Sequence, residues 1–334
     1  MKHLILSLSV AAALAGCAGG SGVAKHDVDV TIPTLNAVNP SKILGDATND
    51  SGTPIEIVSL HTGSGGSAQY AKISIPNPYM PWDDEVNRFL YVTPDGRKYS
   101  FENGFTGPVD ANRWGESNTN VPNRHTPQPT DNGGKLFACC EAADRDFVPA
   151  YLQHTRYGAW ISPTGQADLF VMGTPAPLND MQRVSGASNP TGKATYTVWA
   201  LRVKDGAVVS SSHNNAVGSN IHSLITVNFN TGKVGGTIRG NADFGADINF
   251  NNVNVDGNRF GGSVSSGGVT GQVDGQFFGT KPNRWSSTPS GTEIGGKITF
   301  EGNRSLDSVF GGRVKDWQSR KVDDTSTDLT PLPQ

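Results

Sequence analysis

Apolar and polar residues alternate along several segments in the second half of the chain, which is the pattern of half-buried β-strands. Four segments carry a face of mostly apolar or small residues at every second position. These faces comprise Thr195, Thr197, Trp199, Leu201 and Val203; Ile221, Ser223, Ile225, Val227 and Phe229; Val269, Gly271, Val273, Gly275 and Phe277; and Ile294, Gly296, Ile298 and Phe300. Between residues 246 and 255 the apolar set slips by one position after Phe250, which predicts a β-bulge.

These strands are expected to form a single barrel. With two further candidates at residues 157–161 and 167–172, about eight to ten short strands lie between turn signals. Small inward residues alternate with large ones, which favours a small antiparallel barrel filled by its own side chains. The opposite faces carry polar residues such as Asp247, Gln272 and Lys297, which lipid would not tolerate. We therefore expect a soluble barrel over residues 155–315.

Residues 54–154 are typical of a smaller, irregular β-rich domain. Its strand candidates are residues 54–60, 69–75, 87–93, 97–101 and 135–139. Asp95-Gly96, between the third and fourth candidates, predicts a tight hairpin turn because glycine tolerates positive φ. The predicted fold class is therefore all-β, with this irregular domain preceding the barrel and a polar tail at residues 316–334.

The first of two notable loops in this domain, residues 76–84, places Tyr79, Met80 and Trp82 among three prolines. Prolines limit the entropy that is lost when aromatic side chains dock on a partner, so this loop suits protein recognition. The alternative is that Tyr79 and Trp82 fold back as a lid over the core.

The second loop, residues 106–133, has no strand pattern and includes Arg113, Trp114 and His125. A loop of this length in a compact domain is usually either functional or disordered. We therefore treat these three residues as further candidates for ligand binding.

Residues 1–16 have the pattern of a lipoprotein signal peptide. The apolar run from Leu4 to Ala15 is too short to span a bilayer. Residues 14–17, Leu-Ala-Gly-Cys, resemble the bacterial lipobox, in which the cysteine is acylated after cleavage before it. We therefore expect Cys17 to anchor the protein, and Ala18 in place of an aspartate favours the outer membrane. An ordinary secretion signal with an incidental cysteine is the alternative.

Composition limits the partners of the chain. The formal net charge of −3 gives no reason to expect nucleic-acid binding. The 41 glycines and 20 prolines indicate many turns and little helix. Residues 17–53, with small and polar residues and no periodicity, predict a flexible tether.

Cys139 and Cys140 are the two cysteines that remain once Cys17 is assigned to lipid. Their compartment permits disulfides, although adjacent Cα atoms lie about 3.8 Å apart and a bond between them would be strained. A disulfide between them and two buried thiols both fit the sequence. A metal site is not expected, because no second cysteine pair or closely spaced histidine pair completes one.

Catalysis is not expected, because the chain lacks the serine, zinc-protease and phosphate-loop motifs. Histidine offers a cofactor chemistry, since haem iron takes imidazole ligands in an apolar pocket. His61 follows an apolar strand and precedes a glycine-rich loop, and His125 lies near Trp114 in sequence. These two histidines are the candidate haem ligands.

Six stretches of the barrel resemble landmarks of the transferrin-binding protein B family. They are residues 170–175, 191–196, 227–232, 275–279, 293–296 and 309–313. The resemblance implies a lipid-anchored surface protein with a variable N-terminal handle domain and an eight-stranded barrel. It also implies ligands such as transferrin, haemoglobin, free haem or complement regulators. This chain has one handle-and-barrel lobe where the transferrin receptor has two, which argues against transferrin.

The leading hypothesis is an outer-membrane surface lipoprotein that binds a host protein carrying iron or haem through loops of the handle domain. An outer-membrane transporter is a further candidate partner. The alternatives are a direct haem-binding protein that uses His61 or His125, and a structural envelope lipoprotein.

Overall fold

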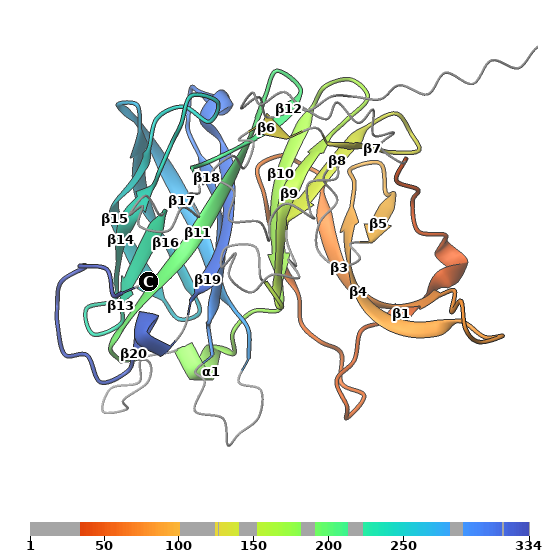
Figure 1. Ribbon diagram of the computed structural model, residues 1–334, viewed down its shortest axis with the longest axis horizontal. Helices are drawn as coiled ribbons and strands as arrows, with labels where there is room; N and C mark the ends of the chain where they lie inside the picture. Colours follow the sequence, from red (N-terminus) through yellow and green to blue (C-terminus); the bar gives the residue numbers. More distant parts are fainter. Residues whose placement is uncertain are drawn as a thin grey trace, which may run out of the picture. The chain divides into compact units, whose positions relative to one another are not determined.

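The computed structural model describes residues 34–100, 124–125, 127–139, 152–181, 191–212, 223–280, 290–315 and 317–333. All of them lie in one folded unit, Ile32–Gln334. This unit is built from β-strands, as the alternation predicted, and the strands form a barrel and two smaller sheets (Figure 1). In the part of the chain that the structure describes, no helix is long and apolar enough to cross a membrane.

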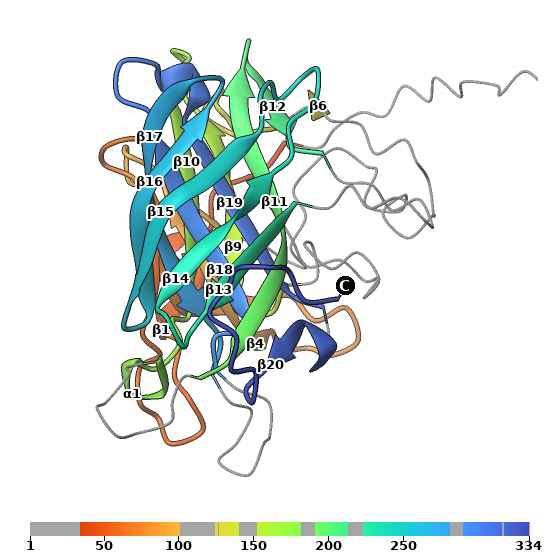
Figure 2. The same cartoon turned by 90° about the vertical axis from the view of Figure 1, so that its left-hand side faces the viewer.

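Eight antiparallel strands close into the barrel, which confirms the predicted fold class. They are β11 (Lys193–Lys204), β13 (Leu224–Asn228), β14 (Lys233–Ile238), β15 (Ile248–Asp256), β16 (Arg259–Ser266), β17 (Val269–Phe278), β18 (Glu293–Thr299) and β19 (Ser308–Val314). β11 closes the ring because it pairs with β13 on one side and with β19 on the other. Figure 2, viewed from the barrel side, shows the strands tilted and wound around a common axis.

The interior of the barrel is filled by its own side chains, as predicted. The ring centroids of Phe260 and Phe277 lie 5.2 Å apart, and those of Phe250 and Phe310 lie 5.8 Å apart. A Cβ atom at Gly275 would lie 2.2 Å from the Phe260 ring. The small residue therefore makes room for the large one on the neighbouring strand.

The predicted bulge is confirmed in β15. The register of β15 against β16 shifts between Phe250 and Asn252. Phe250 and Val253, which lie on either side of the shift, both belong to the core of the barrel. The extra residue therefore keeps the apolar positions inside the barrel.

Both faces of β11 are buried, so the face predicted to be its interior is in fact the outer one. Tyr196 and Val198 belong to the core of the barrel. Trp199 and Leu201 belong to a second core outside the barrel. An apolar run on both faces does not reveal which face is inside.

The handle domain holds the other two sheets, with strand orders β1-β3-β4-β5 and β2-β10-β9-β8-β7, all antiparallel. The strands are β1 (Ile43–Asp46), β2 (Val58–His61), β3 (Ser67–Ile75), β4 (Asp84–Val92), β5 (Lys98–Ser100), β7 (Gln128–Pro129), β8 (Lys135–Cys139), β9 (Thr155–Ile161) and β10 (Ala167–Gly173). A core with Phe89, Tyr91 and Phe170 joins the two sheets. The predicted hairpin turn connects β4 to β5, with Gly96 at φ +82°.

The domain boundary predicted at residue 155 is wrong. β9 and β10 follow it in sequence, yet they pair with β8 and β2 of the handle and with no barrel strand. Tyr157 and Val171 face a core shared with the barrel, and Trp160 and Phe170 face the handle core. A strand that is buried on both faces lacks an alternation of apolar and polar residues, so its sequence does not indicate which sheet it belongs to.

The flexible tether predicted for residues 17–53 is wrong where the structure describes it, at residues 34–53. η1 (Pro40–Lys42) leads into β1, which pairs with β3 at the edge of the four-stranded sheet. Ala47, just after β1, is fully buried. Pairing with β3 satisfies backbone groups that a tether would leave to water.

The predicted polar tail packs along the barrel over residues 317–333. It contains η5 (Trp317–Ser319) and β20 (Arg320–Lys321), and β20 pairs with β11. The remaining short elements are β6 (Arg124–His125), β12 (Ala207–Ser210), α1 (Leu178–Met181) and η4 (Arg304–Leu306).

Candidate functional site

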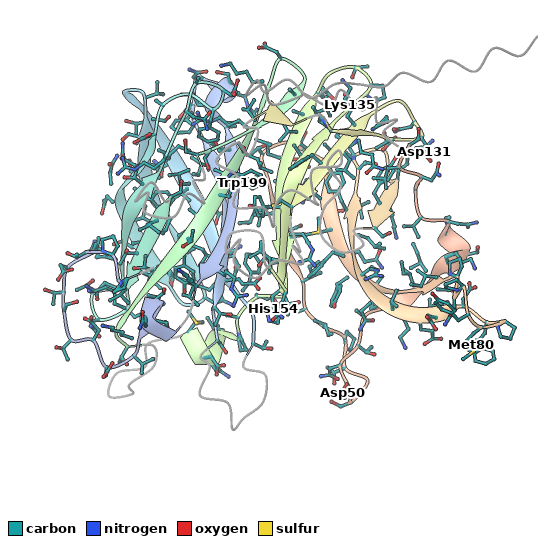
Figure 3. The ribbon with its side chains drawn as sticks, in the orientation of Figure 1. Asp50, Met80, Asp131, Lys135, His154 and Trp199 are labelled. Carbon is teal, nitrogen blue, oxygen red and sulfur yellow. The ribbon has the colours of Figure 1, made fainter. Side chains whose placement is uncertain are left out.

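The loop between β3 and β4, residues 76–83, is held by its own polar groups, and we call it the tip loop. Asn77 Oδ1 accepts a hydrogen bond from the Tyr79 backbone N over 2.8 Å. Asn77 Nδ2 donates to both carboxylate oxygens of Asp84, over 2.9 and 3.0 Å. Three prolines fix φ within the same stretch. Figure 3 places Met80 at the end of the hairpin that lies away from the barrel.

Asp83 anchors the base of the tip loop. Its carboxylate accepts hydrogen bonds from Lys42 Nζ and from Ser74 Oγ, the second over 2.6 Å. These two bonds, that of Lys42 first, lower the pKa of Asp83. Sequence reasoning missed these anchors, because Lys42 and Asp83 are brought together only by the pairing of β1 with β3.

The three predicted recognition residues project from this anchored loop into solvent. Tyr79 is 90% exposed, Trp82 60% and Met80 51%. The alternative in which Tyr79 and Trp82 form a lid over the core is therefore wrong. Leu44 on the edge strand β1 adds a further exposed apolar side chain. Exposed aromatic and apolar groups gathered on one element mark interaction surfaces, so the tip loop is the candidate functional site.

His61 lies in a buried polar network of the handle. Its Nδ1 is 2.8 Å from Asp168 Oδ2, which also accepts a hydrogen bond from Tyr91 OH over 2.9 Å. Burial and the neighbouring carboxylate raise the pKa of Tyr91. His61 Nε2 is buried and has no hydrogen-bond partner. Haem iron could reach this nitrogen only if the handle core opened, so the geometry does not favour His61 as a haem ligand.

His125 belongs to β6, whose backbone pairs with β12. The loop predicted at residues 106–133 therefore contains strand residues, which two-residue strands do not reveal in a sequence. Arg113 and Trp114 lie outside the described residues, as do Cys17 and Cys140.

Cys139 is fully buried in β8 and is disulfide-bonded. Its partner lies outside the described residues, so the pairing with Cys140 stays a prediction. Among the described residues, no group of three or more His, Cys, Asp or Glu side chains could hold a metal ion.

Comparison with known proteins relates the chain to haemoglobin receptors. Residues 87–332 match the family model HpuA, described as haemoglobin-haptoglobin utilisation, porphyrin transporter. The apo haemoglobin receptor HpuA from Kingella denitrificans is 40% identical, with a TM-score of 0.77. HpuA from the same organism in complex with human haemoglobin is 41% identical, with a TM-score of 0.78. Each alignment covers 91% of this chain and 100% of that chain.

A weaker similarity is to isotype 1 transferrin binding protein B from serogroup B Neisseria meningitidis. It has 17% identity and a TM-score of 0.44, and covers 79% of this chain and 44% of that chain. Among curated protein sequences none matches.

Proposed function

The chain belongs to the HpuA family of haemoglobin-haptoglobin utilisation proteins, and on this premise we propose that it is a surface-exposed outer-membrane protein that binds host haemoglobin. The observation that carries the proposal is the 41% identity to a relative solved in complex with human haemoglobin, over that relative's whole length. The role is one of binding and not of catalysis. Haem acquisition from a host protein, the leading hypothesis from the sequence, agrees with this family.

The tip loop is the proposed contact surface for haemoglobin. Tyr and Trp are the side chains that most often dominate binding energy at protein interfaces. Burying one large apolar side chain contributes about 1.5–3 kcal/mol. Because Asn77 and Asp83 already hold the loop, little conformational entropy is lost when Tyr79 and Trp82 dock.

The double variant Tyr79→Ala/Trp82→Ala tests this contact. Its Kd for human haemoglobin should rise at least about tenfold, because truncating aromatic anchors costs about 2 kcal/mol or more. Val322→Ala is the matched control, since Val322 is also exposed but lies on the C-terminal segment; its Kd should not change. Asn77→Ala keeps both rings and releases the loop, and should give a smaller loss of affinity.

Surface plasmon resonance on the full chain measures these constants, and circular dichroism checks the fold. A double variant that is folded and binds as tightly as the wild type would exclude the tip loop. A folded wild type that retains no haemoglobin would exclude haemoglobin itself as the ligand.

We further propose that acyl chains on Cys17 anchor the protein to the outer membrane. The lipobox-like residues 14–17 support this, and each buried methylene contributes about 0.8 kcal/mol to membrane binding. Cys17→Ser should abolish incorporation of labelled palmitate and release the protein from the membrane fraction. An unlabelled wild type that still sediments with the outer membrane would contradict the proposal.

A further inference from the structure

A cavity of about 920 Å³ lies between the handle and the barrel, away from the tip loop and from the Asp168 network. The handle contributes residues from the segment that leads into β2, together with Tyr70. The other side is formed by the segment between β10 and α1 and by the β15–β16 hairpin. Its volume is within the range of about 300–1,000 Å³ that is typical of small-molecule sites.

Apolar side chains from both sides line this junction cavity. The apolar lining residues include Pro54, Ile55, Val58, Pro175, Pro177 and Leu178. Leu178, which lines the cavity, is 51% exposed. A flat apolar ligand would cover surface that is otherwise open to water.

His154 brings an imidazole to the same cavity. It immediately precedes β9 and lies between handle and barrel (Figure 3). Its backbone is anchored, since its N donates to Glu293 Oε2 over 3.0 Å and its carbonyl accepts from Thr174 N over 2.9 Å. Within the described part of the chain, its ring nitrogens make no hydrogen bond or ion pair. An anchored imidazole with both nitrogens unengaged suits a metal ligand.

Arg259 and Glu56 are the charged residues of the lining, one from each side, and both are exposed. Arg259 forms no salt bridge with any described residue. Its guanidinium can therefore pair with a carboxylate of a bound ligand.

We infer that the junction cavity binds a metalloporphyrin, with His154 as axial ligand to the metal and Arg259 paired with a propionate. Apolar lining residues from both sides, one available imidazole and one available cation are groups that can hold the ring, the metal and a propionate of haem. The inference goes beyond haemoglobin binding and uses no residue of the tip loop. It also assigns the haem ligand to His154 in place of His61 and His125.

Titration of the full chain with hemin, followed by absorbance, tests the site. The wild type should show a shifted Soret band that saturates. His154→Ala should raise the Kd for hemin at least about tenfold, as loss of an axial ligand requires. His154→Met should bind hemin with a different Soret position, because a thioether is also an axial ligand of haem. This variant separates loss of ligation from loss of folding.

Matched variants identify the partners of hemin. Arg259→Gln should weaken hemin binding, whereas Arg239→Gln, which removes an exposed arginine paired with Asp247, should not. His125→Ala should titrate like the wild type. A wild-type spectrum that stays that of free hemin, or a His154→Ala variant that titrates like the wild type, would overturn the inference.

The same preparations separate this inference from the proposed function. His154→Ala should bind human haemoglobin as the wild type does, and Tyr79→Ala/Trp82→Ala should keep its hemin binding. A wild type that binds hemin through His154 but retains no haemoglobin would contradict the proposed function and still support hemin binding in the junction cavity.

Discussion

At the scale of single residues, Asp168 joins the two sheets of the handle. Its carboxylate accepts hydrogen bonds from His61 in β2, Tyr91 in β4 and the backbone N of Gly63. A Cβ atom at Gly66 would lie 2.3 Å from Asp168 Oδ2, so the glycine-rich loop closes tightly over this carboxylate. Hydrogen bonds to an ionised acceptor are stronger than those between neutral groups.

Asp168→Asn should lower the free energy of unfolding by about 2–4 kcal/mol, because an amide nitrogen would replace one acceptor in a buried network of donors. Urea denaturation followed by tyrosine and tryptophan fluorescence measures the change. Asp323→Asn, at an exposed position in the C-terminal segment, is the control and should be neutral. Equal midpoints for the two variants would show that the network contributes little.

At the scale of elements, side-chain contacts hold the C-terminal segment 317–333 against the barrel. Asn228 Nδ2 donates to the carbonyls of Ser326 and Asp328, each over 2.8 Å. The Arg320 guanidinium lies 4.3 Å from the centroid of the Phe229 ring. Asp328 Oδ1 also forms an ion pair with Lys193 Nζ over 2.9 Å. Side chains of the barrel therefore replace the hydrogen bonds that this largely irregular segment lacks.

The attachment of this segment to the barrel should weaken in acid. The hydrogen bond from Lys193 is the main cause that lowers the pKa of Asp328 from 3.8 to about 2. A lowered carboxyl pKa contributes stability that is present above the unfolded value and is lost as the pH falls through the folded value. The protection of the segment against hydrogen exchange, relative to the intrinsic rate at each pH, should therefore fall between about pH 4 and pH 2.

Asp328→Asn should remove that part of the pH dependence and exchange faster already at pH 6. Asp323→Asn, a neighbouring aspartate without a partner among the described contacts, serves as the control. An identical pH profile for Asp328→Asn and the wild type would contradict the assignment.

At the scale of the whole molecule, handle and barrel share one hydrophobic core. Trp199 and Val309 from the barrel pack in the same cluster as Phe137, Tyr157 and Val171 from the handle. The Trp199 indole also donates to the Ser211 carbonyl over 3.0 Å. Because each domain covers an apolar face of the other, we expect them to unfold together.

Trp199→Ala should lower the free energy of unfolding by about 3–5 kcal/mol, since it leaves a large cavity in this shared core. Trp82→Ala, at a position that is 60% exposed, is the control and should change it little. Calorimetry of the wild type should show a single transition. Two separate transitions would mean that the handle and the barrel fold independently.

The sequence by itself determined the strands whose two faces differ in polarity. The alternation in β15, β17 and β18, the bulge after Phe250 and the Asp95-Gly96 turn are local features, because side-chain direction has a period of two along a strand. The loop at residues 76–84 could also be predicted, since prolines exclude it from either sheet. These features depend on a residue's neighbours in the chain. The sequence did not decide whether Tyr79 and Trp82 are exposed or cover the core, and the structure shows that they are exposed.

Only the tertiary structure decided where the fully buried strands belong. β9, β10 and β11 are buried on both faces, so their sequences do not show whether they belong to the barrel or to the handle. The tertiary structure also brought Lys42 to Asp83 and placed His154 and Arg259 in the lining of one cavity. Contacts between residues so distant in sequence arise from the pairing and packing of sheets, and hydrophobic periodicity reports that a face is buried without reporting against which partner.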